Sequence, residues 1–377
     1  MAFVFIPETS NIMTTSNSIP FYAKLALCLL ALVLLGAIIY AGSSILMPIC
    51  FAILLAMLLL PVVNWLTRKG VPGVPAMLLS ILLALLFAGG IIYFLSSQVA
   101  DFMSDLPAIK EKLNQHLSTA QDWISHHLNI NKKQQATAAE NVKENMQSGS
   151  GGMGTALVSV ASGLAMLILL PIYTFLILFY RKLIHKFLVD VFPNRHESRV
   201  EEVLTESKTI VQGYMIGLII EMAIVTALNT AGFLIIGIQY AVFLAVFAAV
   251  LNLIPYIGML IASIICMAVT LTTSDSLNDI LWVGVVLIVV QFIDNNFIMP
   301  YIVSSKVRIN ALVSIIGVLI GGGLAGISGM FLSIPVIAVL KAIFDRVDGL
   351  KPWGDLLGDD LSLVTTKKRK GRIKKER

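Results

Sequence analysis

ALVSIIGVLIGGGLAGISGMFLSIPVIAVLKAIF, residues 311 to 344, is apolar along nearly its whole length, yet GGGLAGISGM at its centre holds five glycines and one serine. As one straight helix it would be about 50 Å long, whereas the hydrocarbon core of a bilayer is about 30 Å thick. Glycine is also a poorer helix former than alanine, by about 1 kcal/mol. We therefore expect a membrane segment that breaks or turns back at its glycines, where backbone amides and carbonyls can face a ligand.

The composition of the whole chain is typical of an integral membrane protein. Of its 377 residues, 57% are hydrophobic and 13% are charged, and the charges cluster between long apolar runs. These runs are continuous rather than alternating, which indicates membrane helices and excludes a β-barrel. We predict an all-α, polytopic membrane protein with about six to eight membrane segments, of which two are broken or re-entrant hairpins in an inverted-repeat C-terminal half.

Another broken segment lies earlier in the chain. Residues 240–271 are apolar but are interrupted by NLIPYIG at 252–258. Each broken segment follows a continuous apolar span, at 209–236 and 281–303, so the pattern of helix plus broken segment occurs twice. If both broken segments are hairpins, the two units have opposite orientations, as in the inverted repeats of secondary transporters. Close helix packing through small residues is the alternative explanation of the glycines.

The distribution of basic residues predicts the orientation of the chain in the membrane. Loops rich in Lys and Arg prefer the cytoplasm, which places the loops at Arg68 and Arg181 and both termini inside the cell. With two hairpins, the loop SSKVR, which holds Lys306 and Arg308, is also cytoplasmic, and the acidic loop TTSDSLND is outside. The basic tail KKRKGRIKKER suits anionic lipid, and we favour this partner over nucleic acid.

Composition also divides the chain into five regions. They are the first three transmembrane helices at 1–98, an extracytoplasmic helical insertion and linker at 99–154, the fourth transmembrane helix with a cytoplasmic basic loop at 155–206, a transport core of two repeats at 207–345, and a basic cytoplasmic tail at 346–377.

One carboxylate lies midway along the first helix of each repeat. It is Glu221 in the first repeat and Asp294 in the second. Ionisable groups at such depth are costly, so they usually face a cavity and mark the path of an ion or a proton. Nearby amides that are suited to holding a polar solute or an alkali cation are Asn229, Asn252, Gln291, Asn295 and Asn296. The alternative is a buried polar network that only fixes helix packing.

Other classes of protein find less support. The sequence GISG around Ser328 matches the G-x-S-G of rhomboid proteases, but the last histidine, His196, lies in a loop and no later helix supplies a base. No nucleotide-binding loop and no H-E-x-x-H motif is present. His116, His126 and His127 have no specific metal spacing, and neither do the three cysteines. We expect neither enzyme activity nor a cofactor or metal, and isolated polar patches favour a transporter over a passive channel.

The run DNNFIMPYIVSSKVRINALVSIIGVLIGGGLAGISGMFLSIPVIAVLK, with NLIPYIG before it, resembles the autoinducer-2 exporter family of bacterial multi-pass transporters. The resemblance extends from the first span to about Lys341 and is most specific after residue 250. Ala325 stands where the family often has an aromatic residue. The family-like positions, which include the hinge or hairpin-tip residues, are Pro255, Gly258, Asp294, Asn295, Pro300, Gly321, Gly322, Gly326, Gly329 and Pro335.

The resemblance implies a homo-oligomeric secondary transporter of the bacterial cytoplasmic membrane. Its members are described as exporters of autoinducer-2 or as antiporters that exchange sodium or lithium for protons. The resemblance therefore implies a small polar solute and H⁺ or Na⁺ as ligands, and it leaves the substrate open.

Overall fold

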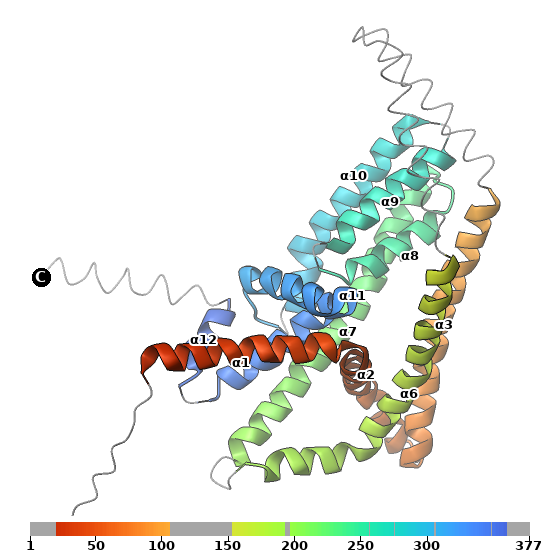
Figure 1. The fold of residues 1–377 in the computed structure, drawn as a ribbon. Coiled ribbons are helices and arrows are strands. Elements are labelled where there is room, and N and C mark those ends of the chain that lie inside the picture. The colour runs from red at the N-terminus through yellow and green to blue at the C-terminus, as the bar shows by residue number, and fades with distance from the viewer. Residues whose placement is uncertain are drawn as a thin grey trace, which may run out of the picture.

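The computed structural model describes residues 20–105, 153–192, 197–255, 257–274, 276–304, 307–347 and 349–359. Every regular element in these ranges is a helix (Figure 1), and seven of the helices described are long and apolar enough to cross a membrane. The prediction of an all-α, multi-pass membrane protein is confirmed. Most of the predicted insertion, including its three histidines, lies outside the described residues, as do His196, Ser305, Lys306 and the C-terminal run KKRKGRIKKER.

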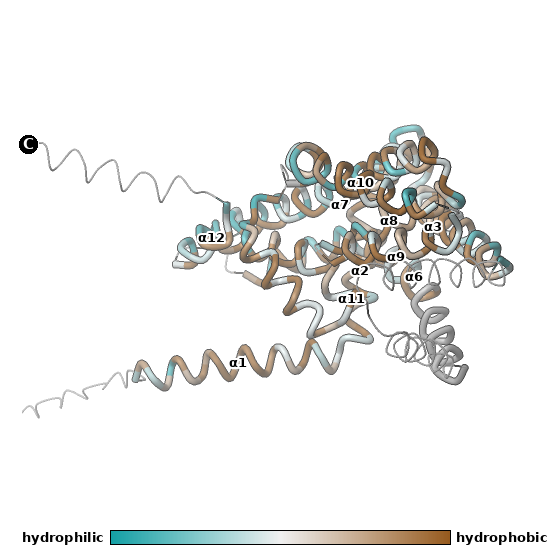
Figure 2. Tube along the Cα trace, turned by 90° about the horizontal axis from the view of Figure 1, so that it is seen from above, coloured by the Kyte–Doolittle hydropathy of each residue, from teal (hydrophilic) through white to brown (hydrophobic). Residues whose placement is uncertain are grey.

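The N-terminal half contains four membrane helices. They are α1 (Phe21–Ala41), α2 (Ser43–Arg68), α3 (Gly73–Ser104) and α6 (Met153–Asp190). Helices α2, α3 and α6 pack around a core that includes Val63, Ala76 and Leu178. Helix α1 has no buried residue, and it lies apart from this bundle in Figure 2.

Several helices extend beyond the apolar spans predicted for them. Helix α6 continues to Asp190, and α7 (Glu197–Ile236) begins 12 residues before the predicted span, so most of the predicted basic loop after Arg181 is helical. Hydropathy marks only where lipid ends, whereas a helix continues into water as long as its backbone remains hydrogen-bonded.

The first broken segment forms a helical hairpin. Helix α8 (Ala241–Asn252) ends at the first residue of the predicted interruption, and α9 (Ile257–Thr273) begins within its last two residues. The two helices pack against each other, and Leu244 and Cys266 share one core with residues of α7 and α10 (Leu277–Ile293). The chain therefore turns back at NLIPYIG, as predicted.

The second broken segment, α11 (Ala311–Phe344), is also bent back on itself. Non-helical backbone at Ala325 and Gly326 makes the turn, and Gly326 has φ of 58°, which glycine adopts without strain. Across the turn, Gly321 and Gly329 face each other so closely that a Cβ on either one would collide with the carbonyl of the other. The glycines form a hairpin, and close packing of small residues, the alternative explanation, occurs at the same place.

The C-terminal half thus consists of two helix-plus-hairpin units. The first unit is α7 with α8 and α9, and the second is α10, its π-helical continuation η2 (Asp294–Ser304) and α11. Because each hairpin returns the chain to the end where it began, α7 and α10 run in opposite directions, as Figure 1 shows. A short helix, α12 (Lys351–Leu357), follows α11 and packs against it.

Candidate transport site

The two predicted carboxylates meet at a single amide. Glu221 lies on α7 and is 4% exposed, whereas Asp294 is the first residue of η2 and is 1% exposed. Asn252, the last residue of α8, donates hydrogen bonds from Nδ2 to Glu221 Oε1 (3.3 Å) and to Asp294 Oδ2 (3.1 Å). One carboxylate from each unit and the turn of the first hairpin therefore form one site.

The site is short of hydrogen-bond donors. Glu221 Oε2 and Asp294 Oδ1 are both buried, and neither has a partner among the residues that the structure describes. Two adjacent buried carboxylates are costly unless a proton or a cation offsets their charge. The arrangement is therefore suited to taking up one positive charge.

Local backbone features position the three side chains. The regular hydrogen bonding of α10 ends at Asp294, where an 11-residue π-helix begins that contains Pro300, a residue without an N–H. Segments of π-helix are frequent at functional sites. In the first hairpin, Gly258 lies against the carbonyl of Leu251 with no room for a Cβ, so this glycine allows the tight turn that presents Asn252.

A cavity of about 650 Å³ opens beside the carboxylates. It lies between α7, the first hairpin, η2 and the start of α11, and no lysine or arginine is among the described residues that line it. Of the predicted site residues, it brings together Glu221, Asn252, Pro255, Gln291, Asp294 and Asn295.

Other predicted residues lie elsewhere. Asn296 is exposed and donates to the carbonyl of Phe292, while Asn229 is buried on α7 with its Oδ1 unpartnered, two turns beyond Glu221. Neither lines the cavity, and none of the predicted hinge positions in η2 or in α11 does so either: they are Pro300, Gly321, Gly322, Gly326, Gly329 and Pro335. The glycine tip therefore serves the packing of the hairpin rather than this cavity.

Three polar residues of the cavity were not predicted, namely Tyr214, Ser314 and Asp359. Tyr214 lies on α7 two turns before Glu221 and is buried, so its spacing of seven residues is a signal that points to it. Asp359 follows α12 and reaches the cavity from the C-terminal segment. No periodic pattern indicates Asp359, because its position depends on how α12 docks.

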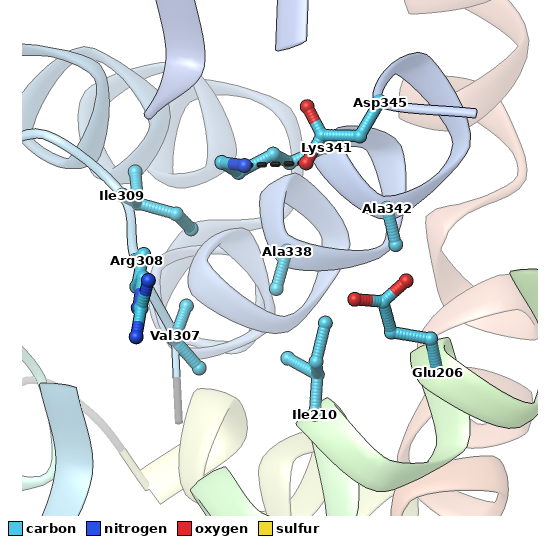
Figure 3. Close-up of a pocket in the computed structure, with 9 residues that line it drawn as sticks. All are labelled: Glu206, Ile210, Val307, Arg308, Ile309, Ala338, Lys341, Ala342 and Asp345. Carbon is cyan, nitrogen blue, oxygen red and sulfur yellow. Dashed lines mark hydrogen bonds and ion pairs between the residues drawn. The ribbon is translucent and has the colours of Figure 1, made fainter. Parts of the chain in front are cut away.

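A smaller cavity of about 290 Å³ lies between α7 and α11, and Val307 and Ile309 line both cavities. Its charged groups are largely paired: Lys341 bonds to Asp345, and Glu206 bonds to Arg346, which lies just beyond the cavity. Figure 3 shows the Lys341–Asp345 pair at one rim and Arg308 on the side opposite Glu206. Since both pairs are neutral, the larger cavity is the better candidate for a transport site.

At the far end of the hairpin, Tyr240 connects it to the N-terminal bundle. The hydroxyl of Tyr240, the residue before α8, donates to Asp105 at the end of α3, and the ring packs edge-on against Phe102. The hydrogen bond to the Asp105 carboxylate, together with burial, raises the pKa of Tyr240 to about 12. This contact fixes the start of α8 relative to α3.

Membrane helices that enclose buried ionisable groups beside a cavity are typical of membrane transport proteins. The chain belongs to the AI-2E transporter family, since the model of that family, described as "AI-2E family transporter", matches residues 27–349.

Relatives with similar sequences carry names of the same kind. The "Putative transport protein YrrI" of Bacillus subtilis is 27% identical over 317 residues, which cover 80% of this chain and 86% of the relative. The "Putative transport protein YhhT" of Escherichia coli is 25% identical over 334 residues, covering 88% and 93%. The "Putative permease PerM" of Escherichia coli is 28% identical over 333 residues, covering 84% and 92%. Transport is thus the activity that these names share.

Proposed function

We propose that this chain is a secondary transporter that moves a small polar solute out of the cell by alternating access. Protons or sodium ions that bind at Glu221 and Asp294 drive this movement. The observation that supports the proposal is the pair of buried carboxylates, one from each helix-plus-hairpin unit, that share the amide of Asn252. The resemblance to autoinducer-2 exporters makes autoinducer-2 the first solute to assay.

Asn252 links the occupancy of the site to the position of the hairpin. A proton or cation that binds Glu221 or Asp294 competes with the amide for the same carboxylate. The turn between α8 and α9 then loses part of its attachment to α7 or to η2. The loaded and the empty site therefore favour different positions of the hairpin. Pro255 and Met259 line the cavity, so a solute there lies beside the moving turn.

A second function, exchange of sodium or lithium for protons, is favoured by the same carboxylates. Each has one unpartnered oxygen, so the pair is suited to binding a proton and a metal cation alternately without any further solute. The two functions differ in one observable: the antiporter moves protons in response to sodium or lithium when no organic solute is present.

Flux measurements on the purified protein test both functions. In inside-out vesicles, we expect uptake of autoinducer-2 to follow an imposed proton or sodium gradient. Asp294→Asn preserves the size of the side chain and removes its ionisation, so flux should lose its dependence on the gradient. Asp101→Asn, at an exposed position near the end of α3, is the matched control and should behave like the unmodified protein. Unchanged gradient dependence in Asp294→Asn would contradict the assigned role.

We also propose that the protein is a homo-oligomer in the lipid bilayer. The family resemblance supports this proposal, and α1 offers an apolar helix with no residue buried by its own chain. The mass of the protein in nanodiscs measures the number of subunits directly, and a monomer there would contradict the proposal.

A further inference from the structure

The C-terminal helix α12 is attached to the loop that begins α11, and Asn310 makes the attachment. Its backbone N–H donates to Leu357 O (3.0 Å), and its Nδ2 donates to Leu356 O (2.6 Å) and Gly358 O (3.3 Å). The Oδ1 of the same residue accepts from the backbone N–H of Val313 (2.8 Å) and so caps α11. One side chain thus starts α11 and holds the segment that follows α12.

A second contact secures α12 from its other side. Gly354 is buried against Asp345, where a Cβ would collide with the carboxylate. Asp345 in turn pairs with Lys341 on the last turns of α11. Helix α12 is therefore attached to both the beginning and the end of α11. This attachment determines where Gly358 and Asp359 lie.

This docking brings Asp359 to the lining of the 650 Å³ cavity, together with Ala311 and Ser314. The cavity then has three carboxylates, and none of the described residues that line it is basic. The two inner ones, Glu221 and Asp294, each have a buried oxygen without a partner. A cavity lined by charge of one sign concentrates the opposite ion at its entrance.

We propose that Asp359 is a third carboxylate of this cavity, which makes the cavity selective for cations, and that Asn310 is the residue that positions it. The role of Asp359 as the point of entry for the cation that binds at Glu221 and Asp294 rests on the proposed function. Its effect on the charge selectivity of the cavity does not, and that effect can be measured without transport.

Thiol chemistry measures the selectivity. In a variant with Cys28, Cys50 and Cys266 replaced by alanine, Ser314→Cys places one thiol in the cavity wall. The ratio of its reaction rates with cationic and anionic methanethiosulfonate reagents reports the local potential. We expect Asp359→Asn to lower this ratio about two- to fivefold, since one charge about 10 Å away in water changes each rate about twofold, in opposite directions.

Matched variants distinguish the effect of a carboxylate at position 359 from the effect of the net charge of the protein. Asp355→Asn removes the same charge from an exposed site on α12 that does not line the cavity, and it should leave the ratio unchanged. Asp359→Glu should restore the ratio. Asn310→Ser should lower it as Asp359→Asn does, because serine still caps α11 but lacks the two donors to Leu356 and Gly358.

Flux then tests the role of Asp359 in transport. Asp359→Asn should raise the KM for the driving cation about two- to fivefold and leave kcat unchanged, whereas loss of Asp294 abolishes coupling. An unaltered thiol ratio in Asp359→Asn, or an equal fall in Asp355→Asn, would overturn the inference. A lowered ratio in a protein whose flux ignores protons and sodium would instead overturn the proposed function and leave the selectivity of the cavity intact.

Discussion

At the level of single residues, Asn252 contacts both carboxylates of the candidate site. Its amide donates one hydrogen bond to a carboxylate of each unit, so this side chain links Glu221 to Asp294. Each such hydrogen bond to a charged group contributes about 1.5 to 3 kcal/mol. The geometry of the site therefore depends on this one side chain.

We expect Asn252→Ala to lower coupled flux by about tenfold or more, because loss of even one of these bonds corresponds to that factor. The matched control is Asn296→Ala, which removes an exposed amide that donates to the carbonyl of Phe292, four residues earlier in the chain. Flux in proteoliposomes is the measurement. Equal rates for the two variants would show that Asn252 does not organise the site.

Tyr240 supports a prediction about stability. Tyr240→Phe removes the hydrogen bond to Asp105 while keeping the ring, so we expect a lower melting temperature in detergent. Tyr93→Phe, at an exposed tyrosine of α3, should not change it.

The difference between Tyr240→Phe and the unmodified protein should also depend on pH. The pKa of Tyr240 is raised to about 12 in the folded protein, above the usual value of 10. The hydrogen bond therefore stabilises the fold fully below about pH 10, and this contribution is lost as the pH rises towards 12. Melting at about pH 8 and about pH 11 checks the sign, since a difference that widens at the higher pH would be inconsistent with it.

At the level of elements, the glycines of α11 differ in what surrounds them. Gly321 faces the carbonyl of Gly329 across the hairpin, Gly322 faces the flexible end of Met330, where a Cβ would lie 2.6 Å from Cε, and Gly323 has open space. Adjacent positions in one sequence motif thus have different structural roles.

We expect Gly321→Ala to lower both the melting temperature and flux, because the new methyl group must push the two arms of the hairpin apart. Gly323→Ala should be neutral or stabilising by up to about 1 kcal/mol, since alanine is the better helix former. The two variants differ only in the face of the helix that carries the methyl group. If Gly321→Ala melts like the unmodified protein, the arms are not packed as described.

At the level of the whole molecule, the hairpins determine which loops share one side of the membrane. The helix from α10 through η2 is long enough to span a membrane, so we expect Asn278 at its start and Arg308 beyond its end to lie on opposite sides. From the charge rule we expect the Arg308 side to face the cytoplasm, together with both termini.

Cysteine labelling in whole cells tests this topology. We expect Asn278→Cys to react with an impermeant reagent added outside and Arg308→Cys to react only after the cells are opened. Both side chains are exposed, so access is comparable. The reverse labelling pattern would invert the orientation of the transport half.

Much of the fold could be predicted from local sequence, because lipid imposes a simple rule of length and polarity on each helix. The spans, both hairpins and their repetition followed from apolar runs and from the glycines and proline that interrupt them. Helix ends such as Asp190 and Glu197 could not be placed, since a helix outside lipid no longer needs apolar residues. The π-helix after Asp294 also had no distinct signal.

The candidate site also has features that the local sequence predicts and features that depend on tertiary packing. The sequence alone determined that Glu221 and Asp294 would be buried in the membrane, because a carboxyl in the middle of an apolar helix has no route to water along that helix. Only the tertiary structure decided that they meet at Asn252, which is 31 residues from one and 42 from the other, and that Asn229 and the glycine tip stay away from the cavity. Depth in a bilayer is a property of each segment by itself, whereas contact between segments depends on how all of them pack.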